Sequence, residues 1–305
     1  MTDTGNTRCG VVAVIGAPNA GKSTLVNQLV GQKVAITSAK AQTTRARMLG
    51  IALHSSGDAE TQMILVDTPG IFAPKRRLDR AMVNAAWEGA EAADAVLLLV
   101  DPIKQRRHEL EPLVEVLAKR PEKKILVLNK VDKAKKEPLL ELAQDLAARV
   151  DFAEVFFVSA LTGDGVADMK QALADMMPQG VWHYPEDQVS DASERLLAAE
   201  VTREQLYQQL HDELPYDSAV RPEQYKTRPD GSLEIHQQIV VGRETQRPIV
   251  LGKGGSRIKA IGEAARKELS EMLGVKVHLF LHVKVSENWA EDKEVFEEMG
   301  LDWVR

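Results

Sequence analysis

Length, composition and charge limit what this chain can be. Its 305 residues suffice for two domains of ordinary size, and 44% apolar residues support full cores. The single cysteine, Cys9, excludes internal disulfides and fits a reducing cytosol. The polar N-terminal segment lacks a signal-peptide pattern, and the most apolar run, residues 95–100, is too short to cross a bilayer. We therefore expect a soluble cytoplasmic protein.

The first predicted elements are a buried strand at 11–15 and a helix at 22–30, joined by a glycine-rich loop. Residues 16–23 match G-x-x-x-x-G-K-[ST], the phosphate loop, whose backbone N–H groups and helix N-terminus favour phosphate. We expect Lys22 to reach the β- and γ-phosphates and Ser23 to ligate a bridging magnesium ion. The loop residues predicted to hold nucleotide are Asn19, Ala20, Gly21, Lys22, Ser23 and Thr24.

Two interpretations of Asn19 stay open. Its amide oxygen can help to hold a monovalent cation near the phosphates. Equally, an asparagine simply tolerates the backbone geometry of such a loop.

The next two segments are expected to respond to the γ-phosphate. The first switch segment should include Gln42-Thr43-Thr44-Arg45, and we favour Thr44 over Thr43 as the magnesium-ligating hydroxyl. Asp67 ends a buried strand and can hold the magnesium through water, and the Gly70 N–H can sense the γ-phosphate. Lys22, Thr44 and Gly70 are therefore the candidate catalytic residues.

The residue after Gly70 is Ile71, where many GTPases have a glutamine that orients the attacking water. Because an aliphatic side chain cannot orient water, we expect slow intrinsic hydrolysis.

Strand and helix patterns alternate from Val11 to about Met177, which predicts a mainly parallel sheet. The exception is the hairpin of 47–54 and 61–66, which places one antiparallel strand at the sheet edge. Predicted helices follow at 78–91, 105–119, 137–149 and 166–177.

The base is predicted from Asn129-Lys130-Val131-Asp132, which ends the apolar run 125–128. The Asp132 carboxylate can accept both the N1–H and the exocyclic amine of guanine, whereas adenine offers no such donor pair. Asn129 would join the base loop to the phosphate loop, and the Lys130 stem would cover the base. Downstream, Ser159, Ala160 and Leu161 would supply a backbone N–H to the guanine carbonyl oxygen. GTP is therefore the predicted ligand.

We predict a GTP-binding domain at 8–178, a linker at 179–189 and a second domain at 190–305 that includes a C-terminal tail. The second domain should contain a helix at 192–211, strands near 216–226 and 233–242, a strand-like segment at 247–251, a helix at 256–273 and a strand at 275–285.

The glycine pattern Gly252-Lys253-Gly254-Gly255 has the spacing of a KH-type clamp on single-stranded RNA backbone. Lys253, Arg257 and Lys259 would add positive charge beside it. The whole chain has a net charge of −6, but residues 242–284 hold nine Lys or Arg and four Glu, a local charge of +5. The alternative is a glycine pair that only caps a helix. We interpret Lys276, Phe280 and Lys284, and the pair His278 and His282, as solvated surface.

Together these motifs resemble the Era family, GTPases that carry a C-terminal KH domain. The resemblance spans essentially the whole chain and rests on 16–23, 42–45, 67–71 with Pro74-Lys75, 129–132, 159–160, Tyr184-Pro-Glu-Asp187 and 252–255. One departure is Ala41, where the family usually has proline; this can loosen the first switch segment and leaves the choice between Thr43 and Thr44 less secure.

The resemblance implies an α/β P-loop GTPase domain, mainly parallel with one antiparallel edge strand, followed by a smaller α+β KH-type domain. It implies a Mg²⁺-dependent GTP hydrolase that binds the 3′ end of small-subunit ribosomal RNA and assists small-subunit assembly. A monomeric state and some peripheral association with the inner face of the cell membrane are further expectations. The alternative is a GTP-gated scaffold or signalling adaptor whose second domain binds protein.

Overall fold

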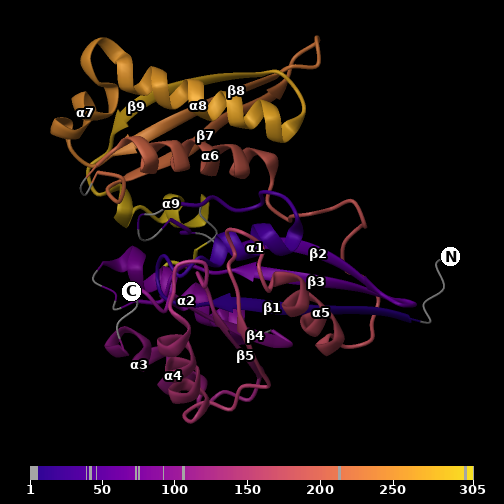
Figure 1. The fold of residues 1–305 in the computed structure, drawn as a ribbon. Helices are drawn as coiled ribbons and strands as arrows, with labels where there is room; N and C mark the ends of the chain where they lie inside the picture. Colours follow the sequence, from indigo (N-terminus) through magenta and orange to yellow (C-terminus); the bar gives the residue numbers. More distant parts are fainter. Residues whose placement is uncertain are drawn as a thin grey trace. The chain divides into compact units, whose positions relative to one another are not determined.

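The structure is a computed structural model that describes residues 6–38, 40, 43–45, 47–72, 74, 76–91, 93–104, 107–211, 214–298 and 301–304. The predicted positions Ala41, Gln42 and Lys75 lie outside these residues. The chain divides into two compact units (Figure 1). The first consists chiefly of Met1–Ala35 and Thr44–Asp191, and the second of Ile36–Thr43 and Ala192–Trp303. The segment Ile36–Thr43 thus packs with residues more than 150 positions downstream.

The first unit is built around a sheet with the strand order β2-β3-β1-β4-β5-β6 in the described part of the chain. Only β2 is antiparallel to its neighbour there; the other described pairs are parallel. The strands are β1 (Thr7–Ile15), β2 (Met48–Ser56), β3 (Ala59–Asp67), β4 (Ala95–Val100), β5 (Lys123–Leu128) and β6 (Glu154–Phe157). The predicted parallel sheet with one antiparallel edge strand is confirmed.

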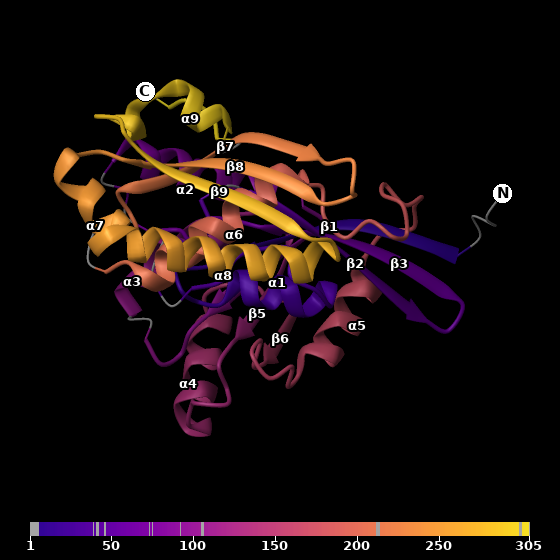
Figure 2. The same ribbon diagram turned by 90° about the horizontal axis from the view of Figure 1, so that it is seen from above.

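Helices cover both faces of this sheet (Figure 2). They are α1 (Lys22–Val30), α2 (Arg77–Glu91), α3 (Arg107–Leu117), α4 (Lys136–Ala147) and α5 (Val166–Met176). Alternate residues of β1 face opposite layers: Val12 and Val14 pack with α1 and α5, and Ala13 and Ile15 pack with α2, α3 and α4. Because both faces of the sheet are buried, the strand sequences are unbroken apolar runs.

The segment predicted as a linker is fastened to the first unit by hydrogen bonds. The amide of Gly180 donates to the Thr7 carbonyl, and the amide of Ile51 donates to the Val189 carbonyl. The buried Gln62 side chain accepts from the amides of His183 and Tyr184 at 2.9 and 3.0 Å. Residues 178–191 therefore run along β1, β2 and β3 as an ordered segment.

The second unit packs two long helices on a described three-stranded sheet of order β7-β8-β9. Strand β7 is antiparallel to β8, and β9 is parallel to it. Its elements are α6 (Glu194–Gln209), β7 (Ser218–Thr227), β8 (Leu233–Val241), α7 (Arg247–Leu251), α8 (Ser256–Leu273), β9 (Val277–Val285) and α9 (Lys293–Glu298). Odd positions of β9 such as Val277 and Leu279 join the core, as its alternating sequence predicts.

One predicted element of this unit is wrong. Residues 247–251 form the short helix α7 and not a strand. Pro248 lacks an N–H for a strand ladder but suits the first turn of a helix, and its carbonyl accepts from the amide of Gly252 at 2.9 Å.

Candidate functional site

The phosphate loop lies at the carboxyl end of β1, where it turns into α1. Gly21 has φ +102°, and a Cβ added there would lie 2.3 Å from the Asn129 Nδ2 atom. Only glycine therefore fits this close approach between two loops. Asn19 also adopts a left-handed conformation, with φ +63°, which asparagine tolerates better than most residues.

Lys22 is buried in this loop. Its side-chain amine is 3.2 Å from the Gly16 carbonyl and 3.0 Å from the Ala17 carbonyl, and the residue is 6% exposed. Burial lowers the pKa of Lys22 to about 8, although the Asp67 carboxylate opposes the shift. Neutral carbonyls compensate a buried ammonium only partly, so an incoming anion would stabilise its charged form.

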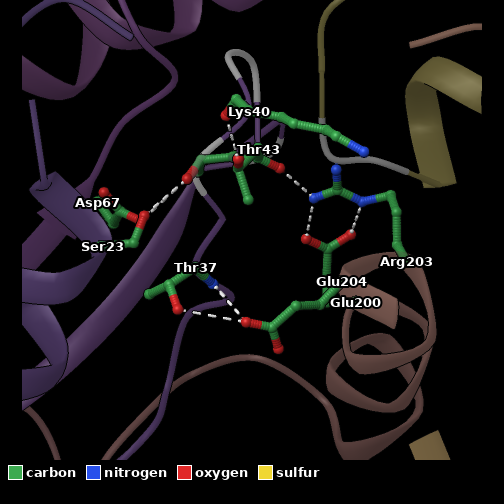
Figure 3. A network of polar contacts seen from close by, with 9 residues as sticks. Ser23, Thr37, Lys40, Thr43, Asp67, Glu200, Arg203 and Glu204 are labelled. Carbon is green, nitrogen blue, oxygen red and sulfur yellow. Dashed lines mark hydrogen bonds and ion pairs between the residues drawn. The ribbon is translucent and has the colours of Figure 1, made fainter. Parts of the chain in front are cut away.

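Three oxygen-bearing side chains meet beside the loop. The Ser23 hydroxyl donates to Asp67 Oδ2 at 2.7 Å, and the Thr44 hydroxyl lies 2.8 Å from Ser23 Oγ and 3.3 Å from Asp67 Oδ2. Thr43 instead donates to the Lys40 carbonyl at 2.8 Å (Figure 3). A carboxylate and two hydroxyls are the hard oxygen donors that Mg²⁺ prefers, so this donor set fits that ion.

Gly70 and Ile71 lie against the phosphate loop from the side of β3. A Cβ on Gly70 would lie 2.7 Å from the Pro18 nitrogen, and the Ile71 amide donates to the Gly16 carbonyl at 3.0 Å. The Ile71 side chain is 7% exposed and packs in the core with α2, α3 and α4. The Ile71 side chain is therefore part of the hydrophobic core.

Asn129 joins three loops at the end of β5. Its amide group donates to the Ala20 carbonyl at 2.8 Å and accepts from the Ala160 amide at 2.9 Å. Ser159 is buried beside Ala160, whereas Leu161 and Asp132 are exposed. The phosphate loop and the two base loops are thus held together by one side chain.

Asp101 is a site residue that belongs to none of the sequence motifs. Its Oδ2 lies 2.6 Å from the Lys130 amine, which also donates to the Asn19 carbonyl at 2.8 Å. Burial opposes ionisation of Asp101, but Lys130 and the amides of Ile103 and Lys104 outweigh it and lower the pKa. The available signal was its position: a carboxylate directly after the buried strand 95–100, at the same sheet edge as the other loops.

The glycine loop of the second unit lies between α7 and α8. Gly254 and Gly255 have φ +60° and +78° with open space around both, and Lys253 and Gly254 are exposed. The loop ends at Gly255, the N-cap of α8. The amine of Lys259 lies 4.0 Å from Glu263, and 76% of the Lys259 side chain is exposed. The Arg257 guanidinium is turned back and donates to the Ile249 carbonyl at 3.0 Å.

The sheet of the same unit carries aromatic and histidine side chains on β8 and β9. Phe280 is 47% exposed and stacks on His236 with ring centroids 4.7 Å apart. His282 lies 3.4 Å from Glu223. Within the described residues, no group of three His, Cys, Asp or Glu side chains is placed to hold a metal ion. No described helix combines the length and the apolar character needed to cross a membrane.

Two family models match the chain. Residues 11–130 match a model described as a 50S ribosome-binding GTPase, and residues 213–290 match a KH domain. The chain is 86% identical to GTPase Era of Erythrobacter litoralis over 98% of both sequences. It is 55% identical to GTPase Era of Bradyrhizobium sp. strain ORS 278, over 99% of this chain and 97% of the relative.

Solved structures agree with this over nearly the whole length. A crystal structure of Era in complex with MgGDPNP and nucleotides 1506–1542 of 16S ribosomal RNA is 36% identical, with a TM-score of 0.90, and the match covers 97% of this chain and 99% of that one. An Aquifex aeolicus Era variant bound to GDP and AlF₄⁻ is similar at the same identity and TM-score, over 96% and 99% of the two chains.

Proposed function

Because this chain belongs to the Era family, we propose that it is a GTP-hydrolysing switch that binds single-stranded RNA near the 3′ end of small-subunit ribosomal RNA. Its role would be to assist assembly of the small ribosomal subunit. The observation that carries the proposal is the similarity to the Era complex with MgGDPNP and 16S ribosomal RNA, which covers 97% of this chain. The chain contains both a phosphate loop and an exposed glycine loop, so it holds the parts for both ligands.

The first unit would select guanine and hold the phosphates. Asp132 would accept the two guanine donors, the Lys130 stem would cover the base, and Ser159, Ala160 and Leu161 would line the loop that donates to its carbonyl oxygen. The phosphates would lie on the amides of residues 19–24, with Lys22 reaching the β- and γ-phosphates. The bridge from Asn129 to Ala20 and Ala160 supports this assignment, because it holds the base loops against the phosphate loop.

Ser23, Thr44 and, through water, Asp67 are the residues that would hold Mg²⁺. The ion would neutralise charge that develops on the phosphate oxygens. Lys22 would stabilise the same charge, and the Gly70 amide would contact the γ-phosphate. Because Ile71 is buried and aliphatic, it contributes no water-orienting group, and the intrinsic rate should be low.

The second unit would clamp RNA backbone at Gly252–Gly255, with Lys253 and Lys259 as the charged contacts. The exposure of Lys253 and Gly254 and the open space at Gly254 support a close approach of the sugar–phosphate chain. Arg257 would join them only after leaving the Ile249 carbonyl.

Further properties of the protein are proposed from the sequence and the family resemblance. They are the domain bounds of 8–178, 179–189 and 190–305, a monomeric state, a cytoplasmic location and partial peripheral association with the membrane. A monovalent cation near Asn19 is also proposed, although the left-handed backbone there is by itself a reason for asparagine.

Crosslinking followed by sequencing of the bound RNA, in GDP and in a non-hydrolysable GTP analogue, tests this function against a protein-binding adaptor. We expect enrichment of the 3′ end of small-subunit ribosomal RNA, lost in the double variant Lys253→Asp with Gly254→Asp. The matched control is Lys267→Asp, because Lys267 is on α8 with 80% of its side chain exposed. Failure to recover RNA in either nucleotide state, with a protein captured instead, would favour the adaptor.

A further inference from the structure

A buried charge pair on α6 holds the end of the first switch segment. Arg203 is 2% exposed, and its guanidinium donates to both carboxylate oxygens of Glu200, with Nε 2.8 Å from Oε1. The same guanidinium donates to the Thr43 carbonyl (Figure 3). Burial disfavours the charged form of Arg203, but the Glu200 carboxylate outweighs it and raises the pKa. The arginine is therefore a fixed, charged donor aimed at one backbone oxygen.

Two further contacts fasten the same segment to α6. Glu204 Oε1 accepts from the Thr37 amide at 2.9 Å and from its hydroxyl at 3.3 Å. The Lys40 amine donates to the carbonyls of Tyr207 and Leu210 at the end of the helix. Residues 37, 40 and 43 are thus held along two turns of one helix, which explains why Ile36–Thr43 groups with the second unit.

The Thr43 carbonyl belongs to the peptide group that continues into Thr44. A peptide group is planar and rigid, so a rotation that moves the Thr44 residue also turns the Thr43 carbonyl. The Thr44 hydroxyl lies in the cluster with Ser23 and Asp67. One peptide group therefore connects the proposed magnesium cluster to the buried Arg203.

On the other side, α6 shares a core with the elements that flank the glycine loop. Leu206 of α6 and Leu210, the C-cap of that helix, pack in one cluster with Val250 of α7 and Ile261 of α8. The Gln205 amide also donates to Glu268 of α8 at 3.1 Å. A shift of α6 would therefore displace residues at both ends of Gly252–Gly255.

We propose that Arg203, held by Glu200, is a positioning residue that couples the nucleotide state at Thr44 to RNA affinity at Gly252–Gly255. When Thr44 leaves the cluster, the Thr43 carbonyl turns away, and the buried guanidinium keeps Glu200 but loses its backbone acceptor. Such a loss is unfavourable, and it gives the two nucleotide states different contacts with α6, as any population shift requires. This inference rests on the proposed function and names the residues through which its switch acts.

The test compares RNA affinity in GDP with that in a non-hydrolysable GTP analogue, using the same single-stranded RNA and the full-length protein. In the parent we expect the two affinities to differ by about fivefold or more, the usual scale of coupling between sites. Arg203→Lys keeps the positive charge but lacks the planar guanidinium group with its several donors. Lys40→Met removes contacts that the first switch segment makes with α6 and leaves the sequence of α6 unchanged. In both variants the ratio should fall to about 1 while each ligand alone still binds.

The matched control is Gln208→Ala, an exposed residue on the same helix, which should keep the parent's ratio. Arg203→Lys should also lower kcat with little change in KM, because Thr44 is less well positioned. Thermal unfolding checks the fold of each variant, and if Arg203→Lys does not fold, Lys40→Met decides. If a folded variant keeps the parent's ratio of RNA affinities, only the role of Arg203 is overturned. If the parent itself binds RNA equally well with GDP and with the GTP analogue, the proposed switch function is overturned.

Discussion

Lys22 should take up a proton when the triphosphate binds. Burial lowers its pKa to about 8, and among the described residues its amine donates to the neutral carbonyls of Gly16 and Ala17. A triphosphate places negative charge beside the amine, which should return the pKa to its ordinary value of about 10.4 or above. Because the bound state then holds the proton more tightly than the free state, binding and protonation are linked.

The size of the effect follows from the free-state pKa. With a pKa of about 8, the deprotonated fraction of Lys22 should be about 0.1 at pH 7, about 0.5 at pH 8 and about 0.9 at pH 9, and the proton uptake per bound nucleotide should follow it. A shift from about 8 to about 10.4 corresponds to about 3 kcal/mol between the two protonation states. Affinity should stay nearly constant below pH 8 and fall by up to about tenfold per pH unit above it.

Titration calorimetry in two buffers of different ionisation enthalpy measures this uptake directly. The control Lys170→Met removes another lysine whose pKa burial lowers, and it should not change the uptake. Lys22→Arg keeps a charge that does not titrate, so any remaining binding should occur without uptake. Absence of uptake at pH 8 to 9, or equal uptake in Lys22→Arg, would show that this buried amine is not the group that gains a proton.

The other site predictions concern the base and the loop. Asp132→Asn should change the preferred nucleotide from GTP to xanthosine triphosphate, and competition binding should show that roughly 2–4 kcal/mol of the binding free energy for GTP is lost. Equal binding of ATP and GTP by the parent would contradict this. Asp101→Asn removes the charged partner of Lys130 and should weaken GTP and GDP alike by about fivefold, or about 1 kcal/mol, in fluorescence titrations; unchanged affinities would assign Asp101 a purely structural role. Gly21→Ala forces a Cβ to 2.3 Å from the Asn129 amide and should abolish nucleotide binding without loss of the folded state by circular dichroism; retained GTP affinity would show that the loop can adapt.

The first unit could be predicted from sequence because its motifs follow buried strands directly. The loops after β1, β3 and β5 meet at one sheet edge, so a motif and its apolar run define a position in space. Asp101 belongs to the same pattern but matches no named motif. The choice between Thr43 and Thr44 needed coordinates, because neighbouring hydroxyls differ only in which way the backbone turns them.

The contacts of α6 were beyond sequence reasoning for a different reason. Arg203 and Thr43 are separated by 160 positions, and a charged residue within a helix is normally solvated. The helix at 247–251 was missed because a short segment of one arginine, one proline and three aliphatic residues suits either a strand or a helical turn, and packing of Val250 into the core decides between them.

Coupling between the two ligands is tested by the affinity of the full-length protein for the GTP analogue and for GDP, with and without saturating single-stranded RNA. If nucleotide and RNA binding are coupled, RNA must change the preference for the analogue over GDP by the same factor by which the nucleotide changes RNA affinity. We expect the two factors to agree and to differ clearly from 1. A preference that RNA leaves unchanged, in a protein that binds both ligands, would contradict this coupling.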